Sequence, residues 1–133
     1  MKYIVSLLLI LTCGGPAYSF DDICAAAIPF VASTTIQIDE FSEKRVVQRT
    51  FQGSGRVRDV RSGGLASKYS VLVDCGKNVL IEVPTSSPRA STNLQIGESI
   101  NFSGTANGVY RRWYADRRTT YLLVTFNDNS SIW

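Results

Sequence analysis

The sequence predicts an all-β fold in which five short strands close into a Greek-key barrel, preceded by a short N-terminal extension. Short runs of β-branched and aromatic residues follow one another closely and are separated by turn residues. Glycines interrupt the first long run, which is typical of a strand that bends sharply in a small barrel. The strands are too few for a seven-stranded sandwich, which favours the barrel.

The first residues predict export. Residues 1–19 begin with a basic Lys2, continue with an apolar run too short to span a bilayer, and end in small residues that suit a cleavage site at Ser19. We therefore expect a signal peptide at 1–19 and a single OB-fold-like domain at 20–133, secreted or periplasmic, with no transmembrane segment.

Cys13 lies inside this expected signal peptide. A lipoprotein signal would place small residues directly before such a cysteine, and Leu11 fits that pattern poorly. We expect Cys13 to leave with the signal rather than to carry a lipid anchor.

The expected mature chain keeps two cysteines, Cys24 and Cys75. In an oxidising compartment a lone pair predicts a disulfide, which here would tie the N-terminal extension to the end of a strand. The alternative is a reactive or metal-binding pair, which the absence of histidine and of a CxxC motif disfavours.

The N-terminal extension predicts little regular structure. Residues 21–32 predict a short helical turn that begins near Asp21 or Asp22 and ends before Pro29. Residues 35–38, with the sequence TIQI, predict a short strand, and residues 39–45 predict a charged connection.

The first barrel strand is predicted over residues 46–61. Gly53 and Gly55 interrupt it and predict a bulge or a sharp bend. The sequence Ser-Gly-Gly at 62–64 then predicts a turn.

The next two runs predict a β-hairpin. Residues 68–75 alternate apolar side chains, and residues 79–83 form a second run that Pro84 is expected to stop. Residues 85–93 are polar and show no helical period, which predicts a loop.

Two strands complete the expected order. Residues 98–106 place Ile100 and Phe102 on one face, and residues 120–126 form a strong apolar strand. A polar and aromatic stretch, residues 107–119, joins them.

This order of strands resembles that of small exported OB-fold domains grouped as tRNA-anticodon-like. The resemblance is carried by the bent strand at 53–60, the hairpin at 68–83, the segment IGESINFSGTA at 96–106 and the strand YLLVTF at 121–126. Most exported members have no assigned function, so the resemblance implies a fold rather than an activity.

A second resemblance is to the receptor-binding subunits of bacterial AB5 toxins, which are exported, disulfide-bonded OB-folds. Cys24 near the expected mature N-terminus and the sequence LIEVPTSS at 80–87 are similar to that group. It implies a glycan-binding subunit. Those subunits carry a long central helix after this strand, whereas residues 85–93 have no helical pattern.

The sequence gives no sign of catalysis. Without histidine it contains no Ser-His-Asp or Cys-His arrangement, and it has no phosphate-cradling motif. The carboxylates of Asp39, Glu40 and Glu43 lie close in sequence but lack the spacing of metal ligands, which favours a solvated turn. We therefore predict a protein that is not an enzyme and uses neither a cofactor nor a metal.

One stretch has the composition of a binding surface. Arginine offers bidentate hydrogen bonds to phosphate or carboxylate, and tryptophan and tyrosine offer flat faces to bases or sugars. The expected ligand-binding residues here are Tyr110, Arg111, Arg112, Trp113, Tyr114, Arg117 and Arg118. The alternative is an ordinary hairpin that uses these aromatic residues for cross-strand packing and the arginines for its solvent face.

A second basic cluster lies on the first barrel strand. Arg56 and Arg58 are expected to join the ligand-binding surface, with Arg61 beside them, if both clusters face one groove. The alternative is a solvated, half-exposed strand.

These observations predict a non-catalytic binding module for an anionic ligand, either nucleic acid or an acidic glycan. Alternatively, the chain is a structural or assembly subunit that binds another exported protein, or an AB5-toxin-like glycan-binding subunit. The formal net charge of +3 does not separate these functions.

Overall fold

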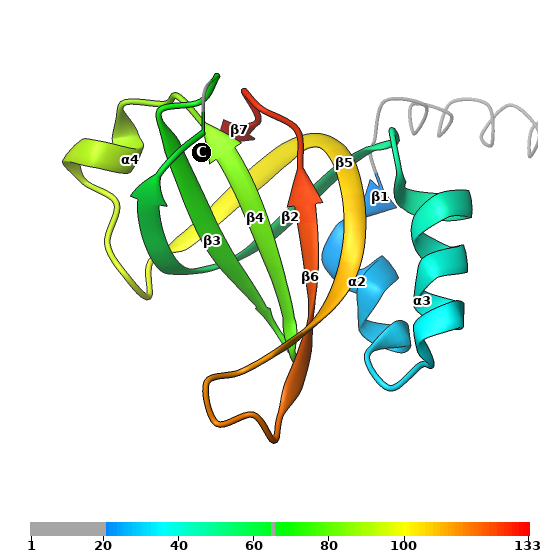
Figure 1. The fold of residues 1–133 in the computed structure, drawn as a ribbon. Coiled ribbons are helices and arrows are strands. Elements are labelled where there is room, and N and C mark those ends of the chain that lie inside the picture. The colour runs from blue at the N-terminus through cyan, green and yellow to red at the C-terminus, as the bar shows by residue number, and fades with distance from the viewer. Residues whose placement is uncertain (1–20, 65) are drawn as a thin grey trace, which may run out of the picture.

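The computed structural model describes residues 21–64 and 66–133 (Figure 1). The expected signal peptide and Cys13 lie outside these residues. Within the described part of the chain, no helix is long and apolar enough to cross a membrane.

The fold is mainly β and is built on a ring of five hydrogen-bonded strands (Figure 1). The ring strands are β2 Thr50–Ser62, β3 Tyr69–Gly76, β4 Val79–Thr85, β5 Ser99–Trp113 and β6 Thr120–Phe126. They pair in the order β2-β3-β4-β6-β5, and β5 pairs back with β2. The predicted five main strands are confirmed.

Within the ring, β4 and β6 are parallel and all other neighbours are antiparallel. Two short strands extend the sheet beyond the ring. They are β1 Asp21–Asp22, parallel to β2, and β7 Ser131–Ile132, antiparallel to β5.

Strand β2 has glycines at two positions where its backbone passes close to other groups. A Cβ atom on Gly53 would lie 2.5 Å from Cζ of the buried Phe102, and one on Gly55 would lie 2.5 Å from the backbone oxygen of Asp74. The register also shifts between Val57 and Asp59. This irregularity lies after the two glycines at which it was predicted, and β2 begins at Thr50 rather than at residue 46.

The strand predicted at residues 35–38 is wrong. These residues open helix α3 Thr35–Phe41, which Thr34 caps: the Thr34 hydroxyl accepts a hydrogen bond from the Gln37 amide, and the Gln37 side chain accepts one from the Thr34 amide. Ile38 and Phe41 point into the core from one face of the helix.

The charged connection predicted at 39–45 is also wrong. The chain stays helical through the end of α3 and then through the π-helical turn η3 Ser42–Val46. Buried Val46 anchors this turn, so the acidic and basic residues occupy the exposed side of a continuous helical segment.

The helical turn predicted at the N-terminus is confirmed as α2 Ile23–Ala27. The Asp22 carboxylate caps it by accepting hydrogen bonds from the amides of Cys24 and Ala25, at 2.9 and 3.3 Å. Pro29 lies in the following 3₁₀ turn, η2 Ile28–Phe30. Cys24 and Cys75 form the predicted disulfide, which joins α2 to the end of β3.

Three further boundaries differ from the predictions. Strand β5 continues to Trp113 rather than ending at residue 106, because residues 106–113 pair with β6. Pro84 does not stop β4, which continues to Thr85. Pro84 lies opposite Ser70 of β3, and Thr85 lies opposite Tyr69. The loop predicted at 85–93 contains one helical turn, α4 Arg89–Thr92, and no long helix.

The core fills the ring and extends under α2 and α3, which cover one side of it (Figure 1). Its largest fully buried side chains are Phe102, Ile23, Ile38, Leu80, Ile81 and Leu122.

Candidate functional site

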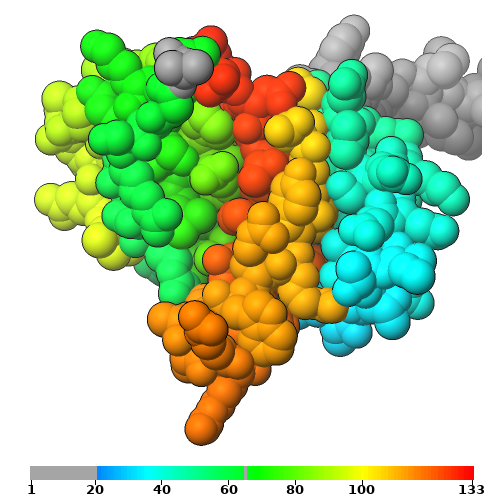
Figure 2. Space-filling model, in the orientation of Figure 1, coloured from blue at the N-terminus to red at the C-terminus, as the bar shows by residue number. Residues whose placement is uncertain are grey.

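The β5–β6 hairpin projects beyond the ring and forms a prominent tip at the bottom of the view in Figure 2. Its turn is closed by backbone hydrogen bonds from Tyr114 N to Thr119 O and from Arg117 N to Tyr114 O, each 2.9 Å long. The tip therefore presents residues 114–119 to solvent in a hydrogen-bonded turn.

Asp116 fixes the shape of this turn. Its carboxylate accepts hydrogen bonds from the amides of Arg118 and Thr119, at 2.8 and 3.1 Å, and from the Thr119 hydroxyl. These hydrogen bonds, first among them the one from the Arg118 amide, lower the pKa of Asp116 below its ordinary value of 3.8.

Tyrosine and arginine side chains stack along one face of the hairpin. The Arg112 guanidinium lies 5.0 Å from the Tyr110 ring centroid. The ring centroids of Tyr114 and Tyr121 are 4.6 Å apart, with the two rings tilted by 40°. Arg112 is directly opposite Tyr121 in the strand register, so the two contact pairs share this face.

Arg58 extends this stack onto strand β2. Its guanidinium lies 5.3 Å from the Tyr114 ring centroid. We call Tyr110, Arg112, Tyr121, Tyr114 and Arg58 the tyrosine–arginine stack. The stack joins Arg58, which belongs to the basic cluster on β2, to the aromatic residues of the hairpin. A groove shared by the two basic clusters would require such a contact.

Arg111 lies on the other face and has a structural partner. Its guanidinium donates hydrogen bonds to the backbone oxygen of Ser33 and to the Thr35 hydroxyl. Arg111 therefore holds the beginning of α3 against β5, and the structure does not bring it together with the stack.

Trp113 is the most exposed aromatic side chain of the hairpin, with 60% of its surface accessible. With Tyr114, Ala115 and Arg117 it lines a hollow of about 540 Å³. We call this hollow the tip hollow. It has an apolar wall and a cationic edge, which suits a ligand with both kinds of surface.

The arginines on β2 differ from those of the tip in their partners. Arg58 faces the Asp74 carboxylate at 3.4 Å, and Arg61 pairs with Asp59 at 2.8 Å. The hydrogen bond from Arg61 lowers the pKa of Asp59 and raises that of Arg61 above its ordinary value.

In contrast, no salt bridge between described residues involves Arg112, Arg117 or Arg118. Asp116 is the one carboxylate of the hairpin residues 110–121, so arginines outnumber acidic side chains at the tip. Arg56 lies apart from the stack and donates a hydrogen bond of 3.1 Å to the Gly97 backbone oxygen.

Sequence reasoning missed two residues that support the stack. Asp74 binds Arg58, and the Asn78 side-chain oxygen lies 3.4 Å from the Tyr114 hydroxyl. Both belong to the β3–β4 hairpin, so only the pairing of the strands could reveal them.

Within residues 21–64 and 66–133, no group of three or more His, Cys, Asp or Glu side chains is placed to hold a metal ion. Comparison with known proteins finds no family model and no curated protein that matches this chain.

Proposed function

We propose that this chain is an exported, non-catalytic binding module with an OB-fold that recognises an anionic ligand, either nucleic acid or an acidic glycan, through the β5–β6 hairpin. One observation carries the proposal: Arg112, Arg117 and Arg118 lack acidic partners among the described residues and lie on the same hairpin as the exposed Trp113.

The strand pairing supports an OB-fold. The long bent β2 pairs with both β3 and β5, and β6 lies between β4 and β5. We interpret this connectivity as that of a five-stranded Greek-key barrel, in which the loop between the last two strands lines the ligand face. On this interpretation, the tip of the β5–β6 hairpin is that loop.

The stacking geometry supports an anionic ligand. A guanidinium is planar and offers paired N–H donors to a phosphate, sulfate or carboxylate group, and a nearby tyrosine ring can hold it in place. The guanidinium carbons of Arg58 and Arg112 lie 5.3 and 5.0 Å from the ring centroids of Tyr114 and Tyr110.

The disulfide supports export. Cys24–Cys75 is consistent with an oxidising extracellular environment, because disulfides persist there and are rare in the cytosol.

The test is a charge-removal variant of the tip, Arg112→Gln/Arg117→Gln/Arg118→Gln. We expect its affinity for single-stranded DNA, RNA or heparin to fall at least about tenfold, and the salt slope for a single strand to fall by about two, since three cations are lost. Fluorescence anisotropy at two salt concentrations measures both quantities.

The matched control is Lys44→Gln/Arg45→Gln/Arg49→Gln, which removes the same charge from exposed residues of η3 and the segment before β2. If the tip variant binds no more weakly than this control, the proposed site is wrong.

The exposed Trp113 also favours a second candidate, a subunit that binds another exported protein. Binding that survives high salt but is lost in Trp113→Ala would support this function, because apolar contacts are not screened by salt.

A further inference from the structure

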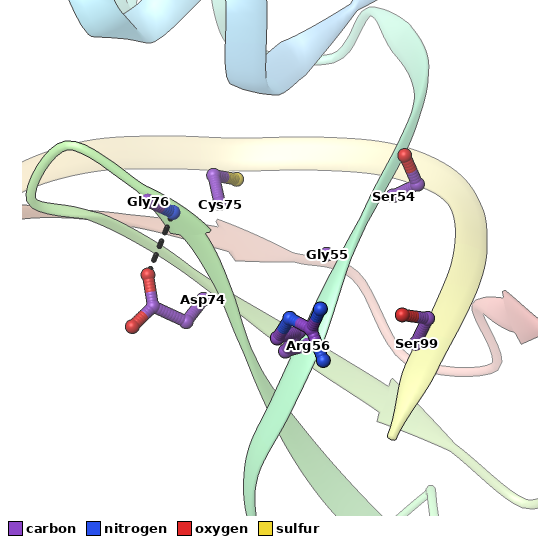
Figure 3. A pocket seen from close by; sticks show the side chains of 7 residues that line it. All are labelled: Ser54, Gly55, Arg56, Asp74, Cys75, Gly76 and Ser99. Carbon is purple, nitrogen blue, oxygen red and sulfur yellow. Dashed lines mark hydrogen bonds between the residues drawn. The ribbon is translucent and has the colours of Figure 1, made fainter. Parts of the chain in front are cut away.

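A second hollow opens where β2 parts from the end of β3 (Figure 3). It measures about 410 Å³ and is lined by Ser54, Gly55, Arg56, Asp74, Cys75, Gly76 and Ser99. Arg56 lies opposite Asp74 of β3 and opposite Ser99 of β5, so its position is fixed by pairing on both sides. We call this the Arg56 hollow.

Most hydrogen-bond donors in the Arg56 hollow are unused. A guanidinium has five N–H donors, and among the described residues Arg56 uses only its Nη1, which donates to the Gly97 backbone oxygen. The hydroxyls of Ser54 and Ser99 make no hydrogen bond with the described residues.

The single carboxylate in the hollow is already engaged. Asp74 accepts a hydrogen bond of 2.7 Å from the Gly76 amide, drawn as the dashed line in Figure 3, and its other oxygen faces Arg58 at 3.4 Å. Asp74 thus compensates Arg58, and Arg56 remains as the cation of a hollow that Ser54 and Ser99 also line. A guanidinium and hydroxyl groups can both donate hydrogen bonds to a sulfate, carboxylate or phosphate group.

A chain of side-chain contacts links the Arg56 hollow to the hairpin. Asp74 lines the hollow and holds Arg58, and Arg58 lies over Tyr114, which lines the tip hollow. A small ligand would occupy one hollow, whereas a polymer with repeated charges would use both.

We propose that the Arg56 hollow is a second anion subsite and that the ligand is an extended acidic glycan whose sulfate or carboxylate groups occupy both hollows. This inference rests on the proposed function. Single-stranded nucleic acid binding uses several aromatic faces in succession. Here the rings of Tyr114 and Tyr121 contact each other, and Arg58 and Arg112 lie over Tyr114 and Tyr110, so Trp113 is the most exposed aromatic face of the hairpin for a sugar ring.

The test compares heparin-derived oligosaccharides of two lengths, a disaccharide and an octasaccharide, by titration calorimetry on the oxidised protein. We expect Arg56→Gln to weaken the octasaccharide about tenfold and to leave the disaccharide within about twofold. Ser99→Ala, which removes only a hydroxyl, should weaken the octasaccharide by a smaller factor in the same direction.

Arg49→Gln is the matched control. Arg49 is an exposed arginine just before β2 that, like Arg56, donates to one backbone oxygen, here that of Lys44. The change therefore removes the same charge and the same kind of hydrogen bond as Arg56→Gln. It should leave both affinities within about twofold.

The outcomes separate the two proposals. If Arg56→Gln and Ser99→Ala bind the octasaccharide like wild type while the tip variant loses it, the second subsite is wrong and the proposed function stands. If wild type prefers an octathymidylate over the octasaccharide, the glycan is wrong. If wild type binds neither polymer, both the subsite and the proposed function fail.

Discussion

Gly53 shows how one residue permits the close packing of this ring. Phe102 is fully buried and makes an edge-to-face contact with Phe126, at 5.6 Å between ring centroids. Its ring lies so close to the backbone of β2 that any side chain on Gly53 would overlap it. The sequence predicts a bulge or a bend at this glycine. It does not show that the phenyl ring of Phe102 excludes a side chain there, because Phe102 lies far away along the chain.

Gly53→Ala should destabilise the protein by about 1–3 kcal/mol, because the added Cβ would overlap the ring of the fully buried Phe102. Urea unfolding measures the change. The control is Gly64→Ala, where an added Cβ would meet nothing within 4 Å and the free energy of unfolding should change by less than about 0.5 kcal/mol. Equal effects at the two glycines would contradict the packing account.

The arginines of the candidate site could be found from sequence, but their roles could not. Arg111 and Arg112 are neighbours in sequence, yet one holds α3 and the other stacks on Tyr110. Alternation along a strand places the two arginines on opposite faces of β5. Only the packing of α3 against one of these faces shows that Arg111 has a structural role.

At the scale of elements, helix α3 differs most from the prediction. The residues of TIQI are mostly β-branched and alternate between polar and apolar, so the pattern predicts a strand. Such short runs do not separate a strand from a helix. The sequence did contain a helix signal: Thr34 is followed three residues later by Gln37, which is the pattern of a capping box. The buried spacing of Ile38 and Phe41 agrees with that signal.

Thr34→Ala should cost about 1 kcal/mol of stability, because the Gln37 amide loses its acceptor at the start of α3. Guanidinium unfolding measures this change. Ser33→Ala, one residue earlier, removes a hydroxyl that makes no hydrogen bond to the described residues and should be nearly neutral, since the Ser33 carbonyl that binds Arg111 is kept. A neutral Thr34→Ala would show that α3 depends on packing alone.

The turn of the β5–β6 hairpin should respond to acid. Because folding lowers the pKa of Asp116, its charge stabilises the folded state above the unfolded pKa, near 3.8, and this contribution is lost as the pH falls through the folded pKa. Asp116→Asn should therefore lower the melting temperature at pH 7, and this difference should shrink below pH 3.8.

Thermal melts across this pH range test the effect. Asp128→Asn is the control, because Asp128 is exposed and its side chain makes no hydrogen bond with the described residues. A difference for Asp116→Asn that stays constant with pH would show that its charge does not support the turn.

At the scale of the whole molecule, the disulfide joins the helical extension to the ring. Cys24 and Cys75 are 51 residues apart in sequence. Closing a loop of this length restricts the unfolded chain and is worth about 4 kcal/mol in the chain-entropy model. The sequence predicts this pairing because the expected removal of residues 1–19 would leave two cysteines, whereas the packing of α2 and α3 against the ring depends on distant contacts that no local pattern encodes.

Replacing both cysteines, as Cys24→Ala/Cys75→Ala, should lower the free energy of unfolding by about 3–4 kcal/mol. Guanidinium unfolding of the variant and of the oxidised wild type measures it. Chemically reduced wild type is the control and should resemble the variant, and a loss below about 1 kcal/mol in both would contradict the loop-closure account.

The projecting hairpin has a consequence for how the chain tolerates cleavage. Arg112, Arg117 and Arg118 are the kind of residue that trypsin cuts after, and the last two lie in an exposed turn. A cut between Arg117 and Arg118 would break the turn but no strand, because β5 remains paired with β2 and β6 with β4. The two fragments should stay together as a folded complex, which makes this turn a natural place to open the chain in a circular permutant.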